Sequence, residues 1–294
     1  MTATSPAPGS PVQGELAGMP KRLYGASPSR LLMWLDCPRR YRMAYLDRPR
    51  PRARPPRAHT SLGVAVHSAL RDFWDVPIGR RLPARGDELV RRSWVTAGFR
   101  DAEQSERWRA ASATHVTSYL QGVDPARQPV GVERTVALKT SALAVTGRID
   151  RLDERPAAGG PGTELVVVDY KTSRAAPSAE DARTSLALAL YAAAAWRMFR
   201  RRCVRVELHH VPTGQVVAHE HTPDGLQRKI AEAESIASDL RRADADFAEL
   251  GAGSRLFEPR TSPLCAWCDY RAYCPEGQRM GPEKSSWAAL EETT

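Results

Sequence analysis

Four cysteines at opposite ends of the sequence constrain the fold more than any other feature. Cys37 stands near the N-terminus, and Cys265, Cys268 and Cys274 follow more than two hundred residues later, in the stretch C-A-W-C-D-Y-R-A-Y-C-P. Four thiolates are the ligand set of an iron–sulfur cluster or of an all-cysteine zinc site. A site of this kind joins the first helix to the tail and closes the intervening chain into one loop.

The remaining cysteine and the N-terminus indicate the cellular setting. Cys203 lies in the alternating stretch C-V-R-V-E-L, and we expect it to be a buried apolar side chain of a strand. The N-terminus has no charged start followed by an apolar core, so it does not predict a secretory signal. Cysteines in such a chain favour metal binding over disulfides. We expect a cytoplasmic, nucleoid-associated protein that does not enter a membrane.

The basic residues are almost all arginines. The 294 residues carry a net charge of +9, and eight arginines accompany a single acid between Arg39 and Arg57. Because the guanidinium group binds phosphate in a bidentate way, Arg39, Arg40 and Arg42 are candidates for nucleic-acid contact. The alternative is an Arg/Pro-rich surface loop from a GC-rich genome, and the sequence leaves both readings open.

Capping residues and hydrophobic periodicity predict the order of the elements. The expected helices cover 28–46 with an interruption at Pro38, 63–74, one or two segments within 86–121, 180–200 and 223–250. The expected strands cover 130–138, 142–152, 164–172, 203–211 and 215–221, with loops at 48–60 and 153–163. This order predicts an α/β domain with a mixed central sheet flanked by helices.

The composition also divides the chain into segments. We expect a disordered leader at 1–22, one domain at 23–280 and a flexible tail at 281–294. Within the domain, a helical insertion of about 76–125 precedes a core of about 129–250 and a cysteine-rich tail of about 255–278.

Charged residues end two neighbouring strands of the predicted sheet. Asp150 ends the motif G-R-I-D, and Asp169 and Lys171 end the apolar stretch V-V-V-D-Y-K. Asp169 and Lys171 point to the same face because they are two apart, and an adjacent strand can bring Asp150 beside them. Two converging carboxylates suit Mg2+ or Mn2+, and a nearby lysine can orient a water. The alternative is an ordinary salt bridge between Asp169 and Lys171.

This combination resembles the PD-(D/E)XK nuclease superfamily, in particular its RecB-like branch. The resemblance implies a restriction-endonuclease-like fold, in which Asp150 matches the acid of the second core strand and Asp169 and Lys171 match D/E-x-K on the third. It implies that His67, in G-V-A-V-H, is a further ligand of the divalent ion together with the Tyr170 carbonyl. Taken alone, without the D-Y-K motif, His67 is better explained as a buried core histidine.

The following helix matches the family in part. RecB-like nucleases carry Q-x-x-x-Y there; Tyr191 matches the tyrosine, whereas Ala187 occupies the glutamine position. We expect Tyr191 to contact phosphate, and the DNA contact of the missing glutamine is in doubt. Glu133, on the first strand, falls where many relatives have a glutamate, although a solvated strand residue is an equal alternative.

The cysteines extend the resemblance. Cys37, followed by C-x2-C-x5-C, is similar to the iron–sulfur staple of CRISPR-associated RecB-like proteins and of the B subunits of AddAB-type helicase–nucleases. The resemblance implies a structural [4Fe–4S] cluster, while the spacing alone leaves Zn2+ open because both accept four thiolates.

The resemblance therefore implies a Mg2+- or Mn2+-dependent deoxyribonuclease. We expect an exonuclease that acts on DNA ends or single strands in repair, recombination or defence, with a helicase, CRISPR or repair protein as partner. The alternative is a non-catalytic nucleic-acid-binding module with a structural four-cysteine site. The complete Asp/Asp/Lys set argues against this alternative, and the missing glutamine favours it.

Overall fold

The computed structural model describes residues 23–157 and 161–291, so the leader expected at 1–22 lies outside the described residues. Six strands form one mixed sheet: β1 (Tyr24–Ala26), β2 (Gly131–Lys139), β3 (Leu143–Pro156), β4 (Thr163–Lys171), β5 (Cys203–His210) and β6 (Gln215–Glu220). Strand β3 pairs with β2 along one edge, and its other edge pairs first with β1 and then with β4. The β4–β5 pair is parallel, so the charged C-terminal end of β4 lies beside that of β5.

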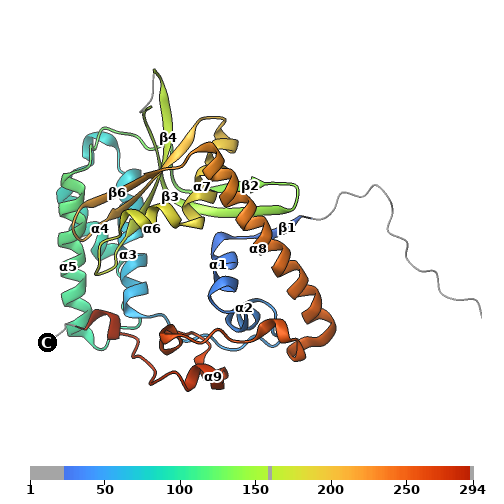
Figure 1. The fold of residues 1–294 in the computed structure, drawn as a ribbon. Helices are drawn as coiled ribbons and strands as arrows, with labels where there is room; N and C mark the ends of the chain where they lie inside the picture. The colour runs from blue at the N-terminus through green and yellow to red at the C-terminus, as the bar shows by residue number, and fades with distance from the viewer. Residues whose placement is uncertain (1–22, 158–160, 292–294) are drawn as a thin grey trace, which may run out of the picture.

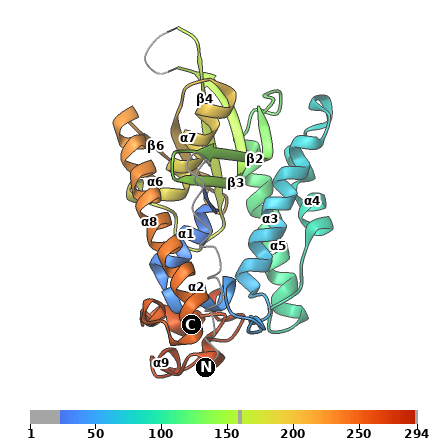
Figure 2. The same cartoon turned by 90° about the vertical axis from the view of Figure 1, so that its right-hand side faces the viewer.

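Helices cover both faces of this sheet. The described helices are α1 (Pro28–Asp36), α2 (Pro38–Tyr45), α3 (Ala58–Asp75), α4 (Gly86–Ser93), α5 (Ala102–Gln121), α6 (Ala179–Thr184), α7 (Leu186–Phe199), α8 (Pro223–Leu250) and α9 (Pro275–Gln278). Short 3₁₀ turns lie at Ile78–Arg80, Pro83–Arg85, Gly251–Gly253, Arg255–Phe257, Pro263–Trp267, Arg271–Tyr273 and Ala288–Leu290. Figure 2 shows α7 and α8 on one side of the strands and α3, α4 and α5 on the other.

Two apolar clusters fill the spaces between the sheet and its helices. On the α7 side, Val167 and Leu208 pack with the buried alanines of α7. On the α3 and α5 side, Val166 and Val168 pack with Phe73. Because successive side chains of a strand alternate between faces, β4 is buried on both faces through its middle, as the run V-V-V predicted. The mixed sheet flanked by helices confirms the expected fold class.

Several elements differ from the sequence-based expectation: β1 was not expected, and the helix expected at 180–200 is divided at Ser185 into α6 and α7. Helix α3 begins at Ala58, inside the expected loop, because the first backbone N–H of the helix donates to the carbonyl of Ser286 at 3.0 Å. This partner lies far away in the sequence, so local propensity did not indicate it. Strand β3 also continues to Pro156, inside the expected turn, where Arg155 forms an ion pair with Glu207 of β5.

The last described residues, within the tail expected at 281–294, contact the helices of the domain. Leu290 is buried, and its carbonyl accepts a hydrogen bond from Trp108 Nε1 of α5 at 3.1 Å. Figure 1 shows this C-terminal segment passing below α2 and ending near the lower end of α5. The chain end therefore packs on the helices that cover one face of the sheet. None of the described helices is long and apolar enough to cross a membrane.

Candidate active site

Strands β3 and β4 bring the two predicted aspartates together. Arg151 pairs with Val168 in the ladder, so the next residues outward on the two strands are Asp150 and Asp169. The backbone N–H of Tyr170 donates to Asp150 Oδ2 at 2.9 Å, which fixes the Asp150 carboxylate against the end of β4. The two acids lie on adjacent strands as predicted, but only Asp169 is near a strand end: β3 continues to Pro156, so Asp150 lies in its middle, just beyond the last residue that pairs with β4.

Lys171 lies on the same face as Asp169. Its Nζ is 2.6 Å from Asp169 Oδ2, and the lysine side chain remains 42% exposed. Burial raises the pKa of Asp169, the charge of Lys171 opposes that rise, and the nearby charge of Asp150 adds to it. A carboxylate crowded by a second carboxylate is a site that gains stability from a cation. The same contact is also expected for an ordinary salt bridge between Asp169 and Lys171, so this pair alone does not identify a function.

His67 reaches the same place from α3. Its Nδ1 lies 3.4 Å from Asp150 Oδ1, and its Nε2 lies 3.1 Å from the carbonyl oxygen of Tyr170. Burial lowers the pKa of His67, but hydrogen bonding and attraction to Asp150 outweigh this effect and raise it overall. The imidazole therefore faces the acids and the carbonyl that the sequence grouped with it, rather than the apolar core.

Glu133 lies in the same group of side chains. The sequence had left its role undecided. His67, Glu133 and Asp150 each offer one ligand atom, and these atoms all lie within 4.8 Å of one another. Glu133 lies opposite Asp150 with a left-handed φ of 46°, a conformation that costs a non-glycine residue about 1–3 kcal/mol. Arg148 holds its carboxylate at 2.6 Å. Asp169 lies outside this group of three. The geometry therefore favours Glu133 as a metal ligand, whereas the sequence left a solvated strand residue equally open.

Tyr191 of α7 lies over Gly147, inside β3 and three residues before Asp150. A Cβ atom on Gly147 would lie 2.3 Å from Tyr191 Cε1, so the ring contacts the glycine backbone directly. Burial and the charges of Asp169 and Asp150 raise the pKa of the Tyr191 hydroxyl. Gly147 belongs to the motif G-R-I-D, and its absent side chain makes room for this ring. Ala187 stands one turn before Tyr191, where a methyl group offers no hydrogen bond.

The donor set suits a divalent cation. Mn2+ readily binds carboxylate and carbonyl oxygens together with one imidazole nitrogen. Mg2+ binds the same oxygens but has a weaker preference for the nitrogen. The buried Asp169 carboxylate and the grouped atoms of His67, Glu133 and Asp150 therefore fit the metal that the sequence predicted.

The four cysteines line one cavity below α2. This cavity, of about 240 Å³, is bordered by Cys37, Cys265, Cys268 and Cys274 together with several arginines. Cys37 is the residue between α1 and α2, and Cys274 precedes α9, so residues from both ends of the chain line this cavity. Cys203 is buried in β5, apart from this cavity, as expected.

The predicted nucleic-acid contacts Arg39, Arg40 and Arg42 have partners within the chain. Arg39 Nε donates to the carbonyl of Phe257 at 2.9 Å, Arg40 pairs with Asp269 at 3.2 Å, and Arg42 pairs with Asp47 at 3.1 Å. Burial raises the pKa of the Cys268 and Cys274 thiols, while Arg40 and Arg39 oppose this rise. These two arginines therefore favour thiolates in the cavity, and their contact with nucleic acid stays a prediction.

Comparison with known proteins agrees with this geometry. The family model described as the PD-(D/E)XK nuclease superfamily matches residues 25–275. No curated protein matches the chain significantly.

Proposed function

We propose that this chain, which belongs to the PD-(D/E)XK nuclease superfamily, is a metal-dependent nuclease that cuts DNA. The observation that carries the proposal is the convergence of Asp150, Asp169, Lys171 and His67 at one end of the sheet. The family match supports the nuclease activity. The proposal goes beyond the family match in two respects: it names DNA as the substrate and Mg2+ or Mn2+ as the required ion.

Each residue has a distinct role in this proposal. Asp150, Asp169, His67 and the Tyr170 carbonyl would hold the divalent ion, and Glu133 would add a further carboxylate. When bound, the ion supplies positive charge that stabilises the phosphodiester oxygens and favours deprotonation of water. The Lys171 ammonium orients the attacking water and offsets the negative charge that develops in the transition state. Tyr191 contacts a neighbouring phosphate of the substrate strand.

Cleavage of end-labelled single-stranded DNA tests the proposal. We expect cutting in the presence of Mn2+ or Mg2+, its loss in the presence of EDTA, and a loss of at least about 100-fold in Lys171→Ala. Lys139→Ala is the matched control, because Lys139 is an exposed lysine at the end of β2. A DNA-binding protein that cuts nothing, or a Lys171→Ala variant as active as wild type, would contradict the proposal.

We further propose that the enzyme is an exonuclease that works on DNA ends or single strands with a helicase, CRISPR or repair partner. Circular and linear single strands of the same sequence separate the two modes, since an exonuclease leaves the circle intact. The competing function is a non-catalytic nucleic-acid-binding module, which Ala187 favours because the expected polar contact is missing. Binding without cutting by metal-loaded protein, alone and with its partner, would select that function.

We propose that the cysteine cavity holds a [4Fe–4S] cluster, with a single Zn2+ as the alternative, because all four cysteines line it. A tetrahedral Zn2+ with Zn–S bonds of about 2.3 Å holds its sulfurs about 3.8 Å apart. Among the described residues no three of the four thiols lie within 4.8 Å of one another, so the sulfurs would have to move closer to bind a single Zn2+. Five arginines line the cavity, and their charge suits a group held by four thiolates, whether a cluster or Zn2+: Arg39, Arg40, Arg57, Arg260 and Arg271.

Anaerobic purification tests this assignment. We expect a brown protein with about four irons and four sulfides per chain, and a Cys268→Ser variant that is colourless and less stable. Cys203→Ser is the matched control, because Cys203 is a cysteine outside the cavity. A colourless wild-type protein that contains one zinc per chain would contradict the cluster assignment and establish a Zn2+ site instead.

A further inference from the structure

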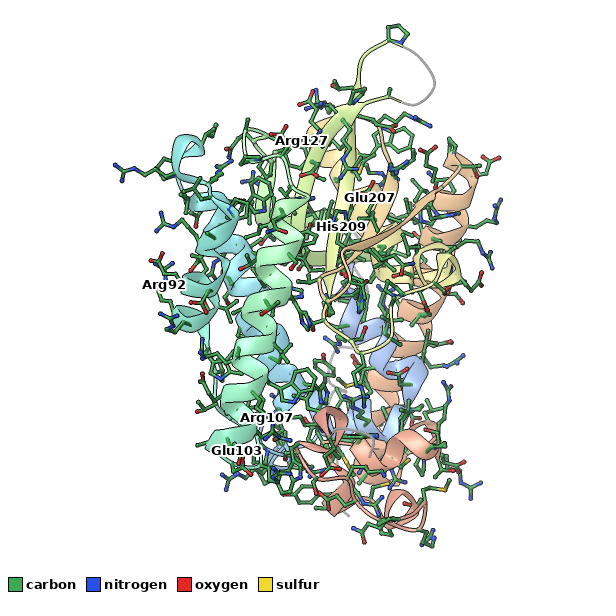
Figure 3. The ribbon with its side chains drawn as sticks, turned by 90° about the vertical axis from the view of Figure 1, so that its left-hand side faces the viewer. Arg92, Glu103, Arg107, Arg127, Glu207 and His209 are labelled. Carbon is green, nitrogen blue, oxygen red and sulfur yellow. The ribbon has the colours of Figure 1, made fainter. Side chains whose placement is uncertain are left out.

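Behind the candidate active site, the sheet buries a group of ionisable side chains. Arg151, Asp153, Glu207 and His209 point to the face that α3 and α5 cover, and they are only 3%, 1%, 0% and 6% exposed. Figure 3 shows Glu207 and His209 close together at the strands, beside the upper end of α5. They line a cavity of about 350 Å³. Because burying charged groups is costly unless they are paired, this cluster requires an explanation.

Hydrogen bonds join these residues into one chain. Glu207 is an acceptor, so His209 Nε2–H donates to Glu207 Oε2 at 2.8 Å, and His209 Nδ1 then accepts from the Tyr119 hydroxyl at 2.7 Å. The Tyr119 oxygen in turn accepts from Arg151 NH1 at 3.3 Å. The same guanidinium donates to the Tyr170 hydroxyl at 2.9 Å. Trp74 Nε1 donates to that hydroxyl as well, at 3.3 Å.

The chain ends at the backbone of the candidate active site. Arg151 directly follows Asp150, and Tyr170 stands between Asp169 and Lys171, so their side chains project behind the sheet while the acids project in front. The backbone N–H of Tyr170 donates to Asp150 Oδ2 at 2.9 Å, and its carbonyl lies 3.1 Å from His67 Nε2. Anchoring the Tyr170 ring from behind therefore anchors two contacts in front.

The chemistry of this cluster does not suit a second reaction centre. The Tyr119 hydroxyl is already engaged as both donor and acceptor, and burial raises its pKa, which opposes a role as a nucleophile. Glu207 and Asp153 are neutralised by Arg155, at 2.6 Å and 3.1 Å respectively. Buried hydrogen bonds and ion pairs of this kind add rigidity at a defined place.

We propose that the chain Glu207–His209–Tyr119–Arg151–Tyr170 is a positioning network for the divalent-metal site. It holds the Tyr170 backbone so that Asp150 and the Tyr170 carbonyl are presented together, without touching substrate. This inference rests on the proposed function, since it assigns the ligands that a nuclease would use. Partners one step behind metal ligands typically change metal affinity by 10–100-fold when they are removed.

Three tyrosine-to-phenylalanine variants of the full-length protein test this role. Tyr170→Phe and Tyr119→Phe each remove one hydroxyl from the network and leave the ring in place. Tyr41→Phe is the matched control: Tyr41 is equally buried, and its hydroxyl contacts Arg30 and Asp244, away from the metal site. The readouts are the dissociation constant of Mn2+ from calorimetry or paramagnetic resonance, the unfolding midpoint, and the Mn2+ concentration that half-saturates cleavage.

We expect Tyr170→Phe and Tyr119→Phe each to weaken Mn2+ binding by about 10-fold. The double variant should lose no more than the worse single variant, because both changes interrupt one chain. All three single variants should lower the unfolding midpoint by similar amounts, because each removes one buried hydroxyl. Only Tyr41→Phe should leave Mn2+ affinity unchanged. Unchanged Mn2+ affinity in Tyr170→Phe, or an equal loss in Tyr41→Phe, would overturn the inference.

The metal readout separates this inference from the proposed function. If the wild-type protein binds Mn2+ and cuts no DNA, the proposed function fails, and a selective loss of Mn2+ affinity in the two variants still supports the network. If the wild-type protein cuts DNA and the variants keep their Mn2+ affinity, the network fails and the nuclease stands. A wild-type protein that measurably binds neither Mn2+ nor Mg2+ would overturn both.

Discussion

Replacing Gly147 by alanine tests how tightly Tyr191 closes over the candidate active site. The new methyl group would lie 2.3 Å from Tyr191 Cε1 and 3.1 Å from Cζ, whereas ordinary contact begins at 3.4 Å. The ring must therefore retreat by about 1.1 Å or the strand must shift. Overpacking of this size costs about 1–3 kcal/mol. We expect Gly147→Ala to lower the free energy of unfolding by that amount and to slow DNA cleavage.

The background in which Tyr191 is already alanine gives the sharper result. Gly147 does not adopt a positive φ, so alanine fits its backbone and restricts the unfolded chain, which is worth about 0.4–1 kcal/mol in favour of folding. Without the tyrosine ring, Gly147→Ala should therefore become neutral or stabilising. Urea unfolding followed by tryptophan fluorescence measures all four members of this cycle. An equal cost of Gly147→Ala in both backgrounds would refute the contact between the ring and the strand.

Two further predictions concern other acids. Glu133→Gln should weaken Mn2+ binding by about 10-fold in calorimetry, and an unchanged affinity would remove Glu133 from the ligand set. Burial alone would raise the pKa of Glu207, but hydrogen bonds from His209 and Arg205 and the charge of Arg155 outweigh burial and lower it to about 2. Because this folded-state pKa is depressed, its stabilisation is present above about pH 4.5 and is lost as the pH falls towards about 2. The loss is on the order of 3 kcal/mol. Unfolding measured across this pH range should show a slope smaller by about one proton in Glu207→Gln, and identical slopes would contradict the predicted shift.

The elements that the sequence predicted correctly are those set by local patterns. The apolar run before Asp169 marks a strand buried on both faces, and the two-residue period places Lys171 beside Asp169. Ser27 and Pro28 mark the start of α1, where the Ser27 side chain accepts from Arg30 N. Each of these signals lies within a few neighbouring residues, so it can be recognised without knowledge of the tertiary structure.

The features that the sequence missed depend on contacts between distant segments. The early start of α3 needs a carbonyl from Ser286, and the position of Glu133 needs a left-handed backbone that no propensity predicts for glutamate. The network behind the sheet joins Tyr119 of α5 to His209 of β5, which are 90 residues apart. The Gly147 close approach had a signal in the motif G-R-I-D, because a glycine inside a strand often marks a tight contact.

The most direct test of the nuclease assignment is cleavage of end-labelled single-stranded DNA by wild-type protein, Lys171→Ala and Lys139→Ala in Mn2+. The arrangement of Asp150, Asp169 and Lys171 predicts metal-dependent cutting by wild type and Lys139→Ala, with the activity of Lys171→Ala reduced at least about 100-fold while DNA binding is kept. Equal cutting by all three proteins would place the activity elsewhere. DNA binding without cutting by any of them, with Mn2+ bound and the partner present, would contradict the nuclease assignment itself.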